Sequence, residues 1–231
     1  MIRFTAFDRE YAECQDEILQ AIDRCGRAGR LILGEGVERF ETEVARRANH
    51  IWAVAVGSGY DALYLALRAC QLVGYVVLPQ YSHISTVNAC LNAGLLPHRV
   101  SDIHARDLRI NPSAYMPVHT EGIVGAPPAT TLPVIEDACQ AFGAAGLGFA
   151  DLTCLSFHPM KVLGAMGDGG AIAGSDPALR DRLLMLRHPG ERGVNSRLDA
   201  IQAAILNVKL RHLDRWLAQR AMLAQRYTHA F

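Results

Sequence analysis

Trp52-Ala53-Val54-Ala55-Val56, followed by Gly57-Ser58-Gly59, is the stretch that decides the fold, and a helical pattern follows it from Asp61 to Cys70. The first segment is uniformly apolar, which predicts a buried strand, and the glycines predict a tight turn. After the turn, apolar residues recur at helical spacing on one face. A buried strand that passes through a short turn into a helix is the repeating unit of parallel α/β sheets.

The same alternation extends from this unit over most of the chain. Further strands are predicted at Val76–Leu78, Leu95–Val100, Tyr115–Val118, Leu132–Glu136, Leu152–Phe157 and Gly170–Ala173. Further helices are predicted at Arg9–Cys25, Val37–Ala48, Ser85–Ala93 and Pro177–Arg187. We therefore expect an α/β fold with a mostly parallel central sheet and helices on both of its faces.

Both ends of the chain are predicted to be helical. Residues 1–48 form an N-terminal helical segment, and one long helix covers roughly residues 197–229. Ser196 is expected to cap that helix, with Asp199 three residues later as its capping-box partner. Because the chain has 231 residues, half of them apolar, we expect residues 1–231 to form one large domain.

The composition argues against several classes of partner and site. Lysine plus arginine and aspartate plus glutamate both number 23, so no net charge points to nucleic acid or to an anionic membrane. The apolar stretches are too short to cross a membrane, and Met1 to Thr5 lack the apolar core of a signal peptide. The six cysteines show no CxxC spacing, which favours reduced, packed thiols and no zinc site. We expect a soluble cytoplasmic protein.

A lysine loop lies between a predicted strand and a glycine-rich stretch. Lys161 closes Ser156-Phe157-His158-Pro159-Met160-Lys161 and is followed by Gly167-Asp168-Gly169-Gly170. Asp137 stands 24 residues before the lysine, at the end of an apolar strand. A lysine amine can hold the aldehyde of pyridoxal phosphate (PLP), and a carboxylate can keep the pyridine nitrogen protonated. The ordinary alternatives are a solvated surface lysine and an aspartate that only caps the segment after it.

The turn Gly57-Ser58-Gly59 is a candidate phosphate site. Backbone N–H groups are free at the start of the following helix, and glycines let a phosphate approach them. The hydroxyl of Ser156 could bind the same phosphate. A plain strand-to-helix turn has the same pattern, so the turn alone leaves both interpretations open. Glu136, beside Asp137, is expected to face the other way because side chains alternate along a strand.

Taken in order, these motifs are similar to those of the sugar aminotransferase family known as DegT/DnrJ/EryC1/StrS, of the aspartate aminotransferase fold type (fold type I). The resemblance runs from about residue 5 to the end of the chain. Its matching segments are Gly34–Glu41, Val56–Leu63, Pro133–Ala141, Ser156–Gly170 and Asn195–Ala204.

The resemblance implies a role for each candidate residue. Lys161 carries pyridoxal 5'-phosphate as a Schiff base and moves a proton between cofactor and substrate, while Asp137 pairs with the pyridine nitrogen. The other implied cofactor contacts are Ser58, Gly59, the amide of Tyr60 and Ser156 at the phosphate, His83 stacked on the ring, Gln140 near the ring hydroxyl, and Asn195 at the phosphate of the neighbouring subunit's cofactor. Two complete sites therefore require a homodimer, and no residue is assigned to a metal.

The implied activity is transfer of an amino group from glutamate or glutamine to a keto sugar carried on a nucleotide. Lys161 favours amino transfer, because relatives with histidine in its place are dehydratases. The alternative is a catalytically impaired remnant of the family that acts as a dimeric PLP-binding or interaction module.

The chain departs from the family pattern at Tyr60, in several short connections and at its end. Tyr60 replaces a small hydroxyl residue, usually threonine, and is expected to turn its side chain away and leave only its amide at the phosphate. The segment Gly122–Leu132 is short for the helix that normally crosses there. The smaller domain that follows the terminal helix in relatives is expected to be missing or truncated, because the sequence stops at Phe231.

Overall fold

The computed structural model describes residues 5–105, 109–190 and 192–231. The helices are α1 (Phe7–Ala28), α2 (Glu35–Arg47), α3 (Gly59–Ala69), α4 (Ile84–Asn92), α5 (Pro177–Leu186), α6 (Ala200–Leu210) and α7 (Leu213–Ala230), with a short 3-10 helix η1 at Thr120–Gly122. The strands are β1 (Trp52–Val56), β2 (Tyr75–Pro79), β3 (Leu96–Val100), β4 (Pro112–Tyr115), β5 (Ile135–Asp137), β6 (Leu152–Ser156) and β7 (Gly170–Gly174).

Each strand and helix predicted from the sequence has a counterpart, although one is displaced. The strand expected at Tyr115–Val118 lies three residues earlier, at Pro112–Tyr115. Helices α1 and α2 make up most of the N-terminal helical segment that was expected at residues 1–48. Residues 1–4 of that segment lie outside the described residues. The short Gly122–Leu132 connection was predicted to leave little room for a helix. All residues between β4 and β5 are described, and the only helix among them is the short η1.

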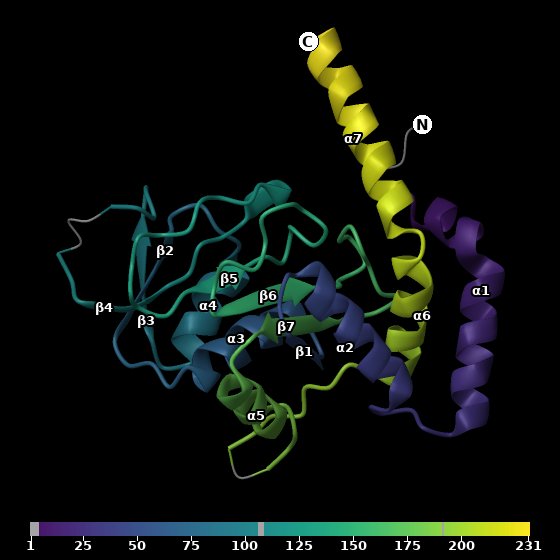
Figure 1. The fold of residues 1–231 in the computed structure, drawn as a ribbon, viewed down its shortest axis with the longest axis horizontal. Coiled ribbons are helices and arrows are strands. Elements are labelled where there is room, and N and C mark those ends of the chain that lie inside the picture. The colour runs from purple at the N-terminus through teal and green to yellow at the C-terminus, as the bar shows by residue number, and fades with distance from the viewer. Residues whose placement is uncertain (1–4, 106–108, 191) are drawn as a thin grey trace.

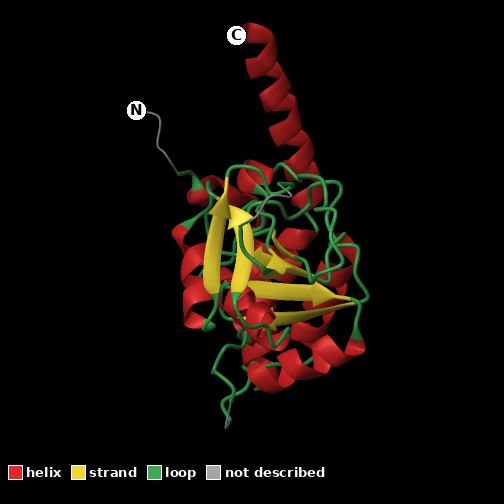
Figure 2. Ribbon diagram, turned by 90° about the vertical axis from the view of Figure 1, so that its left-hand side faces the viewer, coloured by secondary structure: helices red, strands yellow, loops and turns green. Residues whose placement is uncertain are grey.

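The strands form a mostly parallel arrangement, as expected. Strands β3, β2 and β4 pair in parallel in one sheet, and the second sheet has the order β1-β7-β6-β5. Parallel bridges join Tyr115 to Val134 and Val118 to Asp137, so the two sheets continue into one another. Strand β7 runs antiparallel to both of its neighbours. Among the described strands β7 alone is reversed, and Figure 2 shows how strongly the strand direction turns across the molecule.

Helices cover both faces of the sheet. On β1, Ala53 and Ala55 face the core built with α2 and α6, whereas Val54 and Val56 face the core built with α3. Small residues on the first face let these helices and their bulkier side chains pack closely against the strands. Helix α1 lies alongside α6 at the edge of the molecule (Figure 1), where Ile18 packs on Ile205 in a smaller core.

The prediction of one long terminal helix is wrong in two details. The backbone N–H groups of Arg211 and His212 donate to carbonyls three residues earlier, at 3.1 and 3.0 Å, so the chain tightens into a turn between α6 and α7. Asp199, not Ser196, caps α6, and its carboxylate accepts the N–H of Gln202 at 2.8 Å. The Ser196 hydroxyl instead accepts a hydrogen bond from the Gly57 N–H and donates one to Asp61.

Helix α7 starts against the body of the molecule and then leaves it (Figure 1). Leu213 and Trp216 are buried, and the Trp216 indole donates to Glu13 of α1 at 2.9 Å. Every residue from Ala218 to Phe231 is exposed. Within the described parts of the chain, the helices are all too short or too polar to span a lipid bilayer.

Candidate active site

The strand register brings three motifs to one edge of the sheet. Val56 at the end of β1 and Ser156 at the end of β6 both pair with Gly170 at the start of β7. The turn after β1, the serine before the lysine loop and the glycines after it therefore meet at one place. This is the edge where parallel α/β sheets bind ligands.

Close backbone packing explains the glycines in this place. A Cβ atom on Gly59 would lie only 2.5 Å from the Cβ of Ser156, and one on Gly170 would lie 2.2 Å from the carbonyl oxygen of Ser58. Ser58 accepts the Asp61 N–H at 3.1 Å and so caps α3. The first N–H groups of α3, including that of Tyr60, have no partner within the helix, which favours an anion at its start.

Tyr60 is turned away from this turn, as the sequence comparison with the family predicted. Its hydroxyl accepts a hydrogen bond from Asn92 of α4, and its ring stacks on Tyr64 with ring centroids 6.4 Å apart. The bulky side chain therefore leaves the start of α3 open, and only its backbone faces the turn.

Lys161 lies in a loop that is fixed at both ends. The Phe157 N–H donates to Gly169 at 2.8 Å, and the Ala165 N–H donates to Phe157 at 2.7 Å. The Lys161 side chain is half-buried, and none of the described residues gives its amine a hydrogen bond or an ion pair. The chain has one other lysine, Lys209, which is buried, pairs with Glu10 at 2.7 Å and donates to Gly164 at 2.7 Å. Of the two lysines, Lys161 is therefore the one whose amine is available to react.

Asp137 is buried at the end of β5 and is held from two sides. The Thr86 hydroxyl of α4 donates to its Oδ2 at 2.7 Å, and the Cys139 N–H donates to its Oδ1 at 3.2 Å. Sequence reasoning missed Thr86, because nothing in the pattern of a helix shows which carboxylate its buried hydroxyl will meet 51 residues later. Asp137 is thus oriented before any ligand binds.

The neighbouring Glu136 faces the opposite side of the strand, as the alternation predicted. Its carboxylate accepts hydrogen bonds from the Thr153 hydroxyl and from the Gly148 N–H at 3.1 Å, and it pairs with the His119 ring at 3.0 Å. All of these groups are protein atoms of the other core face, so Glu136 does not compete with Asp137 for a ligand.

Cys139 lies beside Asp137, and the charges of both Asp137 and Lys161 influence the pKa of its thiol. Burial raises the pKa of this thiol well above its ordinary value, and the negative charge of Asp137 acts in the same direction. The positive charge of Lys161 acts on the same pKa in the opposite direction. A Cβ on Gly59 would lie 3.2 Å from this sulfur. The aspartate and the Gly59 turn therefore both contact this half-buried cysteine.

Three of the predicted contacts engage partners of their own in the structure. The His83 ring is exposed and accepts the Ser85 N–H at 3.2 Å, which caps α4. The Gln140 side chain accepts the Glu121 N–H at 2.7 Å. Asn195 is exposed and accepts a hydrogen bond from Arg197 at 2.6 Å. Their predicted roles at the ring and at a neighbouring subunit stay predictions.

Side chains behind the turn hold β1 in place, and the sequence did not reveal them. The Ser196 hydroxyl accepts the Gly57 N–H at 2.9 Å and donates to Asp61 at 2.8 Å. The Glu41 carboxylate accepts the Ala55 N–H at 2.8 Å, and Arg187 donates to Glu41 at 2.6 Å and to the Ala55 carbonyl at 3.1 Å. Because β1 ends the sheet, this ion pair satisfies backbone groups that a further strand would otherwise bind.

The family model of the DegT/DnrJ/EryC1/StrS aminotransferase family matches residues 12–231. The chain belongs to this family. It is 37% identical to the erythromycin biosynthesis sensory transduction protein EryC1 of Saccharopolyspora erythraea, over 98% of this chain and 70% of that protein. It is 36% identical to the dTDP-3-amino-3,4,6-trideoxy-alpha-D-glucose transaminase of Streptomyces venezuelae, over 98% of this chain and 68% of that protein.

The comparison with solved structures agrees with the fold. The crystal structure of S. venezuelae DesV in complex with a ketimine intermediate has a TM-score of 0.86 and 35% identity, and the match covers 98% of this chain and 70% of that one. The fold is therefore that of the PLP-dependent aminotransferases of fold type I. As expected from the sequence, this chain is shorter than its relatives, of which it spans about 70%.

The residues present fit PLP, the cofactor of this class of enzyme. The close approach of Gly59 to Ser156 makes a place where a side chain is excluded and backbone N–H groups are open. The unpaired amine of Lys161 and the buried, oriented carboxylate of Asp137 supply the two groups that a pyridine aldehyde needs.

Proposed function

We propose that this protein transfers an amino group from glutamate to a nucleotide-linked keto sugar, with PLP held by Lys161 and Asp137. One observation carries the proposal. The Gly59 turn, which excludes side chains, lies against Ser156 at the start of the lysine loop and against Cys139, whose N–H binds the buried Asp137 carboxylate. Family membership supports the reaction class, and the transaminase relative named above supports a nucleotide-linked sugar as the acceptor.

When bound, PLP supplies an aldehyde that holds the amino group and a ring that accepts electrons from the substrate carbon. Asp137, aimed by the Thr86 hydroxyl, binds the pyridine nitrogen and keeps a proton on it. The Lys161 amine lies in a loop fixed at both ends, so it can take a proton from the substrate carbon and return it at a fixed position.

Ser58, Gly59, the Tyr60 amide and Ser156 are proposed to bind the phosphate at the start of α3. The partial positive charge of a helix N-terminus favours this anion. The turned-away Tyr60 side chain also bears on the impaired-remnant alternative. A tyrosine in this position could block the phosphate turn and impair the site, but its side chain contacts Asn92 and Tyr64 instead.

We further propose that residues 1–231 act as one cofactor-binding domain in a homodimer. His83 would stack on the ring and Gln140 would lie near its hydroxyl. Asn195 is exposed, and its neighbour Ser196 is bonded to the Gly57 turn. An exposed amide next to a fixed residue suits contact with the cofactor phosphate of a second subunit. All six cysteines are free thiols, which fits a reducing compartment such as the cytoplasm.

Half-transamination tests the proposal directly. The purified protein is loaded with PLP, and glutamate is added without a sugar. The absorbance of the lysine-bound cofactor should be replaced by that of the aminated cofactor, with one 2-oxoglutarate released per site. Lys161→Ala is the matched variant and should release none. A cofactor spectrum that stays unchanged with glutamate in the unmutated protein favours the dimeric binding module instead.

A further inference from the structure

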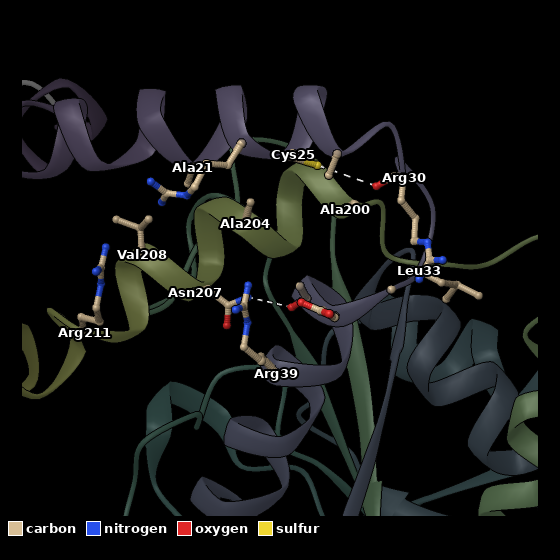
Figure 3. A pocket seen from close by; sticks show the side chains of 15 residues that line it. Ala21, Cys25, Arg30, Leu33, Arg39, Ala200, Ala204, Asn207, Val208 and Arg211 are labelled. Atoms are coloured by element: carbon tan, nitrogen blue, oxygen red, sulfur yellow. Dashed lines mark hydrogen bonds between the residues drawn. The ribbon is translucent and has the colours of Figure 1, made fainter.

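A groove of about 820 Å³ lies between α1, α2 and α6, outside the candidate active site. Figure 3 shows its wall side chains: Arg39 reaches from α2 toward Asn207, and Arg211 extends from the end of α6. Arg24 on α1 and Arg30 in the loop after it also line the groove. None of the residues assigned to the cofactor takes part in it.

The groove concentrates positive charge in a chain whose formal net charge is zero. Four arginines line it, against the single carboxylate of Glu35. Arg211 is neutralised by Glu17 at 2.5 Å. The side chains of Arg24, Arg30 and Arg39 make no hydrogen bond or ion pair with any described residue. Three guanidinium groups without an ion-pair partner outweigh this one carboxylate and create a net positive potential in the groove.

The rest of the wall leaves room for a ligand larger than a single ion. Small side chains line the groove between the arginines, namely Ala21, Ala28, Ala200 and Ala204, with Gly34 and Gly36 at the start of α2. The volume lies in the range that small organic ligands occupy. The three unpaired arginines come from three different segments, α1, the following loop and α2, so a ligand with more than one anionic centre can pair with several of them.

We propose that this arginine groove binds a small molecule that carries a diphosphate group. Guanidinium groups pair with phosphate oxygens through two parallel hydrogen bonds each, and a diphosphate offers oxygens on two centres. The ligand contributes the negative charge that the groove lacks. This binding is independent of the proposed cofactor binding, because the groove contains no residue of the cofactor site.

Calorimetric titration with inorganic pyrophosphate tests the proposal, and inorganic phosphate serves as the smaller probe. The full chain is first loaded with PLP, so that the cofactor phosphate site is filled. Binding of pyrophosphate should be tighter than binding of phosphate and should weaken as salt is raised. The double variant Arg24→Gln/Arg39→Gln should bind pyrophosphate at least about tenfold more weakly. The control Arg226→Gln, at an exposed arginine of α7, should bind as the unmutated protein does.

The cofactor spectrum and the association of subunits are measured in the same variants. The cofactor spectrum should be the same in all variants, which separates loss of this site from loss of the active site. Pyrophosphate that does not bind, or that binds equally to the double variant, overturns the proposal. A double variant that changes the association of subunits without changing pyrophosphate affinity also overturns it, because the groove is then a protein contact.

Discussion

At the scale of single residues, the site depends on side chains that are absent as much as on those present. Gly59 and Gly170 lie so close to Ser156 and Ser58 that any side chain there displaces its neighbours. Lys161 and Asp137 bring the reactive groups, and Thr86 orients the second of them. The proposed chemistry thus requires two kinds of residue: glycines that leave space for close backbone contact, and charged side chains that react with or bind the cofactor.

Replacing Gly59 by alanine tests whether cofactor binding requires a residue without a side chain at this turn. The added methyl would lie 2.5 Å from the Cβ of Ser156, a strand residue that cannot swing aside, so the turn or the strand must shift. We expect the dissociation constant of PLP to rise at least about tenfold, which corresponds to about 1.4 kcal/mol. The control is Gly26→Ala on α1, where a Cβ meets nothing within 4 Å. Equal cofactor affinity in the two variants would show that the close contact is irrelevant.

The residues found from the sequence are those whose neighbours in the chain carry the signal. The Lys161 loop, the Asp137 strand end and the Gly57–Gly59 turn each occupy one continuous segment. Thr86, Glu41 and Arg187 were not found, because their partners lie 51, 14 and 132 residues away in the chain. Ser196 was placed wrongly for the same reason: its hydroxyl serves Gly57 and Asp61 across the fold rather than its own helix.

At the scale of strands and helices, the edge strand β1 is stabilised by an ion pair between the buried Arg187 and the partly buried Glu41. Arg187 is only 5% exposed and contacts both Glu41 and the Ala55 carbonyl. The pair fixes the strand just before the Gly57 turn, so stability and cofactor binding are linked here.

The change Glu41→Gln tests that link. It leaves the Arg187 charge buried without a counter-charge, so we expect the free energy of unfolding to fall by about 3–5 kcal/mol in urea titrations. The control Asp23→Asn removes the carboxylate from the exposed pair with Arg27 and should cost less than about 1 kcal/mol. If the two changes cost the same, the buried pair is not what secures β1.

His50 gives a prediction for the pH dependence of stability. Its ring contacts Thr153 at 2.8 Å and Ser175 at 3.3 Å, and burial lowers its pKa below the ordinary value. As the pH falls through the ordinary value of about 6.5, the unfolded chain takes up a proton that the folded ring resists, so stability falls.

The variant His50→Gln should therefore lose less thermal stability than the unmutated protein between about pH 7 and pH 5. Part of the fall should remain, because burial also lowers the pKa of His188. Thermal midpoints measured at both pH values decide the point. Midpoints that fall by the same amount in both proteins contradict the assigned role of His50.

The strands and helices themselves were largely predictable, because apolar periodicity reports burial on a sheet or a helix face. The short β4–β5 connection was also predictable from its length. The break between α6 and α7 was not, since the apolar stripe runs through it from Val208 to Leu213 and Trp216. The turn comes from local backbone hydrogen bonds at Arg211 and His212, which periodicity does not report.

At the scale of the whole molecule, the proposed dimer makes a prediction that a single chain cannot satisfy. If Asn195 serves the cofactor of the other subunit, Lys161→Ala and Asn195→Ala are defects of different sites. A mixed dimer of the two variants then contains one site with both residues intact. Random association should restore about a quarter of the sites of the unmutated protein, because half of the dimers are mixed and each has one complete site.

This complementation is measured as amino transfer after the two inactive or weakened variants are unfolded and refolded together. The same variants mixed without refolding serve as the control for subunit exchange. Activity that equals only the sum of the separate variants would place Asn195 in its own subunit's site or outside both.

The central claim is that Lys161 is the residue that holds PLP, and the chain is well suited to a direct measurement. It contains only two lysines, and Lys209 is buried in an ion pair with Glu10, so it serves as an internal control. The protein is incubated with PLP, reduced with borohydride, digested and analysed by mass spectrometry. The account predicts a pyridoxyl group on the peptide that contains Lys161 and none on the peptide that contains Lys209. A protein that carries no label at Lys161, or carries as much on Lys209 or the N-terminal amine, would contradict it.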